Sequence, residues 1–374
     1  MRRETTDISG AALAQHAGAL LEIDLDAIAA NYALLRARHP SGPVAGVVKA
    51  DGYGLGAAPV AARLFRAGCR HFFVAHLSEA LAIRAQIPGA LLAVLNGLLP
   101  GTEDVFLQHE IFPVLGSLEE ISSWSTQARR AGKKLPALLH VDTGMSRLGL
   151  DFSAVTALAT DKNLLAGIGI QYVMTHLVSS EIPNDTRNAH QKEIFDAACA
   201  MLPPAPRSVA NSSAIFLGPD FGSDLARPGA ALYGINPTPA EENPMANVVR
   251  LLVRVLQIRE IRAGETVGYN ATWTAQRPSR IATACIGYAD GWRRTLSNRG
   301  TARFDGTTLP LVGRVSMDLT SFDITDRPDI APGVFLELLG PGHGPDEVAA
   351  QAGTNAYEVL TSLGRRFSRV YRGA

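Results

Sequence analysis

The chain has 374 residues, more than one ordinary compact core needs, so one large domain and a smaller one are expected. Lys plus Arg and Asp plus Glu number 35 each, and this balance disfavours a nucleic acid or an anionic membrane as partner. Cys69, Cys199 and Cys285 lie far apart, with a spacing that fits neither a zinc site nor a disulfide framework. No run of about 18 apolar residues occurs, so we expect a cytoplasmic protein that acts on small molecules.

The predicted elements begin after an N-terminal tail, residues 1–19, whose charged start argues against a secretory signal. Residues 20–23 are predicted to form a short strand, and Asp24 or Asp26 to cap the helix that follows. Further apolar runs recur with helical segments between them, at residues 44–48, 72–75, 91–95, 112–115, 137–141, 170–175, 208–210 and 225–233. This alternation predicts an α/β fold, a (β/α)8 barrel of the TIM type over residues 20–240. A doubly wound sheet is the alternative, but no Gly-x-Gly-x-x-Gly follows the first strand.

Polar residues gather where these predicted strands end. Lys49 follows the first run, His176 the sixth and Ser212 the seventh, while Arg227 lies in the eighth. In a (β/α)8 barrel the C-terminal ends of the strands carry the active site. Lys49 ends a buried strand, where lost hydration lowers its pKa and favours the free amine that attacks carbonyl groups. The pattern therefore predicts a reactive lysine among polar side chains.

The pattern changes after residues 237–244, a segment rich in Pro, Glu and Asn. Alternating runs follow at residues 248–258, 280–286, 308–312, 315–322 and 334–339, with turn residues between them. Residues 241–374 are therefore predicted to form a mostly β C-terminal domain, which the strand near residues 20–23 can join. A last helix is predicted at residues 355–363.

Several of these segments together resemble the alanine racemases, enzymes of fold type III that use pyridoxal phosphate (PLP). The matching segments are, in order, residues 48–54, 141–149, 175–177, 211–212, 227–234, 268–273, 286–291 and 313–318. The first, the second and the last are each specific, and the first contains Lys49-Ala50-Asp51-Gly52-Tyr53-Gly54. The resemblance implies that Lys49 holds PLP as a Schiff base and serves as one proton-transfer base, with Tyr269 as the second. Racemisation removes a proton from one face of the substrate and returns one to the other, so it uses a base on each side.

The resemblance also implies a cofactor site. The phosphate would be bound by the hydroxyls of Tyr53, Ser212 and Tyr357 and by the backbone N–H groups of Gly229 and Ala230. His176 and Arg227 would make a cationic neighbourhood that lowers the pKa of Tyr269. Because an arginine keeps its proton, Arg227 would leave the pyridine nitrogen unprotonated and disfavour side reactions such as transamination.

The resemblance further implies how the substrate is bound. Arg147 would contact the phenolic oxygen of PLP and the substrate carboxylate, the N–H of Met317 would help to bind that carboxylate, and Tyr288 would narrow the entrance. In this family the residues corresponding to Tyr269 and Met317 come from the partner subunit, which implies a homodimer with shared active sites. The implied reaction is the interconversion of L-alanine and D-alanine, for peptidoglycan or for alanine catabolism.

Two positions depart from the commonest family pattern. His140 occupies the place of a lysine that is carbamylated in many members, so another group has to position Arg147, and Ser316 stands where cysteine is frequent. Three alternatives remain: a racemase for serine or another amino acid, a fold type III decarboxylase of basic amino acids, and a non-catalytic PLP-binding barrel. The pair of bases and Arg227 argue against the decarboxylase, and the long C-terminal segment argues against the barrel alone.

Overall fold

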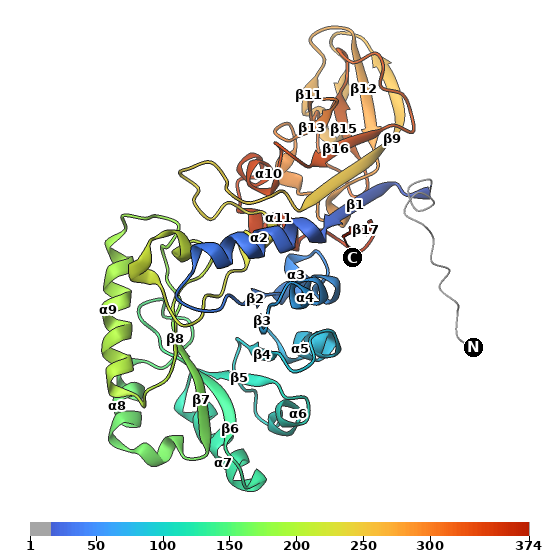
Figure 1. The fold of residues 1–374 in the computed structure, drawn as a ribbon. Helices are drawn as coiled ribbons and strands as arrows, with labels where there is room; N and C mark the ends of the chain where they lie inside the picture. Colours follow the sequence, from blue (N-terminus) through green and yellow to red (C-terminus); the bar gives the residue numbers. More distant parts are fainter. Residues whose placement is uncertain (1–15, 374) are drawn as a thin grey trace, which may run out of the picture. The chain divides into compact units, whose positions relative to one another are not determined.

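The computed structural model describes residues 16–373, so residues 1–15 of the predicted tail lie outside the described residues. The chain divides into two compact units (Figure 1). Residues 28–246 form one unit, and residues 16–27 combine with residues 247–373 to form the other. No helix within residues 16–373 is long and apolar enough to cross a membrane.

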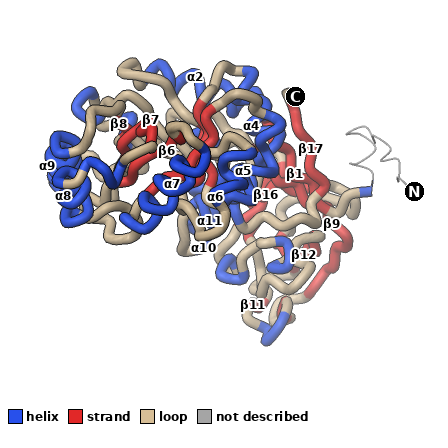
Figure 2. Tube along the Cα trace, turned by 90° about the horizontal axis from the view of Figure 1, so that it is seen from below, coloured by secondary structure: helices blue, strands red, loops and turns tan. Residues whose placement is uncertain are grey.

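A parallel sheet, with its strands in sequence order, forms the centre of the unit at residues 28–246. Its strands are β2 (Gly46–Val47), β3 (His71–Val74), β4 (Leu91–Val94), β5 (Phe112–Leu115), β6 (Leu135–His140), β7 (Ile168–Met174) and β8 (Arg207–Ser208). Parallel neighbours need a crossover connection, usually a helix. The connecting helices are α4 (Ala57–Arg66), α5 (Leu77–Ile83), α6 (Glu103–Gln108), α7 (Leu118–Ala131), α8 (Phe152–Thr160) and α9 (Thr186–Met201). Figure 2 shows these helices outside the strands, which confirms the predicted barrel class.

The last predicted strand of the barrel is shorter than expected. Val44 and Ala226 form an isolated parallel bridge, and the N–H of Arg227 donates to the carbonyl of Ala210 at 2.8 Å. Residues 225–228 therefore lie between the chain that enters β2 and the chain that leaves β8. Pro228 has no N–H to continue the pairing, and Ala230–Tyr233 form a 3₁₀ helix. The prediction of a strand through residue 233 was wrong.

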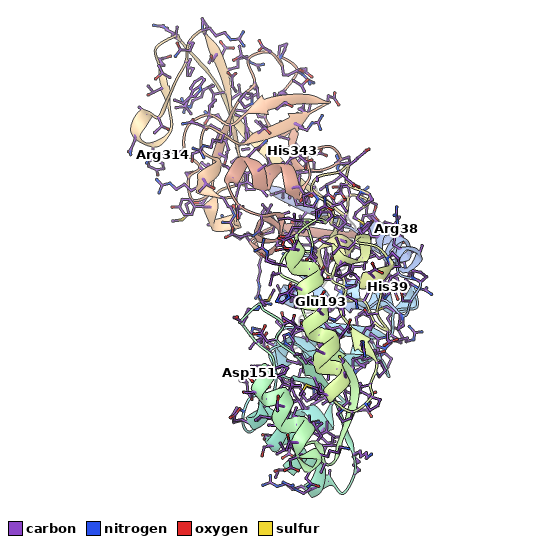
Figure 3. The ribbon with its side chains drawn as sticks, turned by 90° about the vertical axis from the view of Figure 1, so that its left-hand side faces the viewer. Arg38, His39, Asp151, Glu193, Arg314 and His343 are labelled. Carbon is purple, nitrogen blue, oxygen red and sulfur yellow. The ribbon has the colours of Figure 1, made fainter. Side chains whose placement is uncertain are left out.

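Side-chain caps determine where several barrel helices begin. Asp151 accepts from the N–H of Ala154 at 2.7 Å and starts α8, and Ser117 accepts from Glu120 at the start of α7. Figure 3 shows Asp151 beside α8 and Glu193 on α9. The strands between the helices are apolar on both faces, as the buried Phe72, Phe73 and Val74 of β3 show. This packing fixes the strand ends that carry the polar residues.

The other unit is mostly β and is built around the long strand β9 (Val249–Ile261). β1 (Ala19–Asp24), β12 (Ser279–Ala284) and β16 (Phe335–Leu339) pair with β9 in antiparallel fashion. β13 (Thr301–Phe304), β14 (Thr307–Pro310), β15 (Thr320–Asp323) and β17 (Ser368–Arg372) extend the sheet, and β10 (Thr266–Val267) pairs with β11 (Trp273–Thr274). The N-terminal strand β1 thus pairs with the C-terminal part of the chain.

Three further helices lie near the two ends of the chain. α2 (Leu25–Arg38) follows β1, and the side chain of Asp24 accepts from the N–H of Ala27 at 2.8 Å, so Asp24 rather than Asp26 caps it. α10 (Pro345–Ala352) was not predicted, nor were β13 and β17. α11 (Ala356–Thr361) lies in the predicted final helix, where Asn355 accepts from Glu358.

One predicted strand of the second unit begins late. Residues 315–319 form a turn, and β15 starts only at Thr320. Ser316 holds this turn, because its hydroxyl donates to the carbonyl of Leu319 at 2.7 Å and accepts from the N–H of the same residue at 3.1 Å. A serine that bonds neighbouring backbone competes with the strand ladder.

Candidate active site

Lys49 begins a turn with an unusual backbone, separated from the end of β2 only by Val48. Residues 50–53 have φ angles of 54°, 53°, 62° and 54°, so α3 (Lys49–Tyr53) is a left-handed turn. Such angles cost about 1–2 kcal/mol for each residue with a Cβ atom. Asp51 opposes this cost, since its carboxylate accepts from the N–H of Ala57 at 2.8 Å. Backbone strain of this kind persists where surrounding structure holds it, commonly at functional sites.

The ammonium form of Lys49 is disfavoured in its environment. Burial is the main cause that lowers the pKa of Lys49, and the nearby Arg147 lowers this pKa further. Glu79 acts in the opposite direction and raises it. The net effect is a lowered pKa, which makes the free amine easier to form, as the position of Lys49 at a buried strand end led us to expect.

Arg227 is buried without a carboxylate partner in its unit. Its guanidinium donates to the hydroxyl of Ser208 and to the carbonyl of Thr175, two neutral acceptors. Asp224, the acidic residue just before it, instead accepts from the N–H of Arg207 at 2.7 Å. Burial lowers the pKa of Arg227 to about 10, so it remains charged at neutral pH. A buried cation whose acceptors are all neutral has no anionic group in its unit to compensate its charge.

Two neutral histidines lie near these cations. Burial, followed by the charge of Arg227, lowers the pKa of His176 to about 3 and that of His140 to about 4. The expectation that His176 adds positive charge is therefore wrong; the positive charge nearby comes from Arg227 and Arg147. The barrel brings five predicted residues close enough for their charges to shift one another's pKa. They are Lys49, His140, Arg147, His176 and Arg227.

Arg147 is presented by a loop that Asp142 organises. The carboxylate of Asp142 accepts from the N–H groups of Gly144 and Met145 at 2.9 Å, and from that of Ser146. Arg147 itself is exposed and has no ion-pair partner within residues 28–246. A cavity of about 280 Å³ is lined by Arg147, His140 and neighbouring loop residues. A carboxylate that enters this region would meet an available guanidinium.

A compact cradle forms around Gly229. The hydroxyl of Ser212 accepts from the N–H of Gly229 at 3.0 Å and from that of Ala231 at 3.2 Å. The ring of Tyr53 stacks on Tyr233, with centroids 4.6 Å apart, and the Tyr233 hydroxyl donates to the carbonyl of Val47. Tyr53, Ser212, Gly229 and Ala230 therefore lie together, as the resemblance implied.

Gly229 cannot carry a larger side chain without moving Tyr53. A Cβ atom on residue 229 would lie 2.1 Å from the Tyr53 hydroxyl. We expect Gly229→Ala to weaken PLP binding and to lower the free energy of unfolding by about 1–3 kcal/mol, the usual cost of overpacking. Gly169→Ala is the control, because its Cβ would have no neighbour closer than 3.7 Å. Fluorescence titration with PLP and chemical denaturation measure both effects; equal results for the two variants would contradict the prediction.

The remaining predicted residues lie in the mostly β unit and are exposed. The exposed fractions are 68% for Tyr269, 54% for Met317, 46% for Tyr357 and 44% for Tyr288. The turn of Tyr288 lies beside residues 316–317, since the N–H of Tyr288 donates to the carbonyl of Ser316 at 2.9 Å. Exposed aromatic and apolar side chains often mark a binding surface.

Sequence reasoning missed three residues that hold this site in place. Asp142 shapes the loop of Arg147, Tyr233 supports Tyr53, and Glu79 accepts from the N–H of Ala50 at 2.6 Å. Asp142 has a local signal, since aspartate before Thr-Gly is typical of a turn that bonds its own backbone. Tyr233 and Glu79 act over long sequence separations, and no local pattern indicates their partners.

Comparison with known proteins identifies the family. The family model "Alanine racemase, N-terminal domain" matches residues 23–237, and "Alanine racemase, C-terminal domain" matches residues 248–371. The chain is 57% identical to the alanine racemase of Acidiphilium cryptum over 94% of this chain and 98% of that protein. It is 49% identical to the catabolic alanine racemase of Mesorhizobium japonicum over 96% of this chain and 94% of that protein.

Solved structures agree with the sequence comparisons. The structure of alanine racemase from Bartonella henselae with covalently bound pyridoxal phosphate matches with a TM-score of 0.92 and 42% identity. The match covers 95% of this chain and all of that one (100%). The barrel holds a lysine of lowered pKa and a buried arginine whose acceptors are neutral. With both family models matched along the chain, this protein belongs to the alanine racemase family.

Proposed function

We propose that this protein interconverts L-alanine and D-alanine with PLP as its cofactor. One observation carries the proposal: the same barrel unit contains a lysine of lowered pKa, Lys49, and a buried arginine, Arg227. Arg227 has only neutral hydrogen-bond partners in that unit. The names and titles of the relatives supply the substrate, alanine, and the cofactor. The D-alanine formed would serve peptidoglycan synthesis, or the reaction would serve alanine catabolism, as the name of the Mesorhizobium relative suggests.

The barrel residues fit PLP. Arg227 has only neutral acceptors in its unit, and the absence of a Cβ atom at Gly229 lets the Tyr53 hydroxyl approach the backbone of the cradle closely. Lys49 would hold the cofactor covalently, and His176 and Arg227 would contact its ring. The hydroxyls of Tyr53, Ser212 and Tyr357 and the N–H groups of Gly229 and Ala230 would hold its phosphate. When bound, PLP supplies the electron sink that acidifies the α-proton of an amino acid.

The residues of the chain divide the remaining work. Lys49 takes up or returns the α-proton on one face, for which a lowered pKa suits it, and Tyr269 does so on the other. Arg147 and the N–H of Met317 bind the substrate carboxylate, and Tyr288 narrows the entrance. Arg227 keeps its own proton, so it would hold the ring nitrogen of PLP without protonating it. An unprotonated ring nitrogen favours prompt return of the α-proton over transamination.

We infer a homodimer whose active sites combine residues of both subunits. The barrel unit is the proposed PLP-binding domain, and the mostly β unit is the proposed carrier of Tyr269 and Met317. The exposure of these two side chains supports the proposal, because a partner subunit would give them something to contact. We also propose a cytoplasmic location, which the free thiols of Cys69, Cys199 and Cys285 support.

One assay separates the proposed reaction from its alternatives. The protein is incubated with PLP and L-alanine, L-serine or L-lysine, and D-isomers and CO2 are measured. We expect D-alanine to form fastest and no CO2 to be released. Faster formation of D-serine would indicate a serine racemase, and release of CO2 without D-alanine would reject the racemase in favour of a decarboxylase.

A further inference from the structure

Two glutamates of the barrel unit make the same kind of cross-link at the C-terminal ends of the strands. Glu79 is the third residue of α5, and Glu120 is the third residue of α7. Glu120 accepts from the N–H of Gly116 at 2.6 Å, in the loop that enters its own helix. It also accepts from the N–H of Leu98 at 2.9 Å, in the loop after β4. The carboxylate therefore ties two neighbouring loops together.

Glu79 repeats this arrangement on the loop that carries Lys49. Its carboxylate accepts from the N–H groups of Ala75 and His76, at 2.8 and 3.0 Å, in the loop that enters α5. Its other oxygen accepts from the N–H of Ala50 at 2.6 Å. Hydrogen bonds to an ionised acceptor are about twice as strong as neutral ones. Glu79 thus connects the end of β3 to the residue that follows Lys49.

The hydrogen bond from Ala50 to Glu79 lies where it can hold the left-handed turn in place. Ala50 is the first residue of the left-handed turn and has a φ of 54°, a conformation that alanine does not favour. Without an external anchor, the turn would gain by relaxing toward ordinary backbone angles. Because Lys49 and Ala50 share a peptide bond, relaxation at Ala50 would change the direction of the Lys49 side chain.

We propose that Glu79 is a positioning residue for proton transfer: by anchoring the N–H of Ala50, it holds the strained turn and directs Lys49. The inference rests on the proposed function of Lys49. A misplacement of about 1 Å can cost about 100-fold in rate. Glu79 acts through the turn and is not itself a catalytic residue.

Glu79 also has an electrostatic effect on Lys49. The groups that act on Lys49 are Arg147, which lowers its pKa as burial does, and Glu79, which raises it; the neighbouring His176 is neutral. Loss of the Glu79 charge would therefore lower the pKa of Lys49 further. A residue that only ties loops together elsewhere in the barrel would leave the pKa of Lys49 unchanged when it is replaced.

The first experiment compares Glu79→Gln with Glu120→Gln. The reactivity of Lys49 toward an amine-selective reagent is followed against pH in PLP-free protein by mass spectrometry, and thermal unfolding is recorded for each variant. We expect both variants to lose some stability, and Glu79→Gln alone to shift the Lys49 titration to lower pH. Enzymatic activity is not compared, because Glu120 lines a cavity together with Arg147, the proposed substrate-binding residue. The Lys49 titration and thermal unfolding do not depend on substrate binding. An unshifted titration in Glu79→Gln would contradict the electrostatic part.

The second experiment separates position from charge. Glu79→Asp keeps the charge but is one methylene shorter and cannot reach both loops. We expect a kcat about 10- to 100-fold below that of the wild type, with a Lys49 titration close to normal, and faster hydrogen exchange at the Ala50 amide. Wild-type kcat and unchanged exchange would overturn the inference. If the wild type itself forms no D-alanine, the proposed function fails, while exchange and titration still decide whether Glu79 holds the turn.

Discussion

Lys49→Ala is expected to abolish racemisation and the visible absorbance that PLP acquires when attached to a lysine. The substitution removes both the amine that would hold the cofactor and one of the two proposed bases. General acid–base catalysis alone contributes about 10²- to 10⁴-fold, so we expect a loss of at least about 10³-fold. D-alanine formation and the absorbance spectrum at saturating PLP measure the two effects.

Lys162→Ala provides the matched control for this variant. Lys162 is an exposed lysine in the 3₁₀ helix after α8 and lies away from the proposed site residues in the sequence. Its loss should leave both the activity and the spectrum of the bound cofactor unchanged. Circular dichroism establishes that each variant is folded. Substantial activity in folded Lys49→Ala would reject Lys49 as the attachment site and as a base.

Lys49→Ala should also change how the free energy of unfolding depends on pH. The folded state lowers the pKa of Lys49 below its ordinary value of 10.5, so between these two pKa values the unfolded chain binds more protons. Unfolding free energy therefore rises with pH across that window, and the buried ammonium costs stability below it. Denaturation of PLP-free protein at several pH values should show this rise in the wild type. The rise should be smaller in Lys49→Ala.

The strand ends were predictable because their residues combine two signals. An apolar run followed at once by Lys49, or by His176, indicates both a buried strand and the point where it ends. The barrel then brings such ends together, whatever their separation in sequence. For this reason the cluster of Lys49, His176 and Arg227 could be inferred before its geometry was known.

The left-handed turn after Lys49 could not be predicted in the same way. An alanine such as Ala50 rarely adopts a positive φ, and the turn depends on contacts with Ala57 and Glu79 that lie further along the chain. The neutral state of His176 was missed for a related reason, since it depends on burial and on the charge of Arg227. Where tertiary contacts overrule local preference, a local pattern carries no signal.

Tyr269→Phe is expected to reduce racemisation by about 10²- to 10⁴-fold, the usual contribution of a general base, while leaving Lys49 intact. The phenyl ring keeps the shape of Tyr269 but holds no proton. Lys49 can still exchange the α-proton that faces it, so one enantiomer of alanine should still exchange with D2O without inversion. Nuclear magnetic resonance of each enantiomer in D2O measures this. Loss of exchange from both enantiomers would show that Tyr269 is more than the base for one face.

A mixture of Lys49→Ala and Tyr269→Phe chains then tests whether the two bases come from different subunits. In a dimer with shared sites, a mixed pair has one site with both defects and one site with neither. Random exchange makes half of the dimers mixed, so activity should recover to about a quarter of the wild-type value. If each chain supplies both of its own bases, no site in a mixed dimer is intact and nothing is recovered. The exposed Tyr269 favours the first outcome, because that side chain is available to a partner subunit.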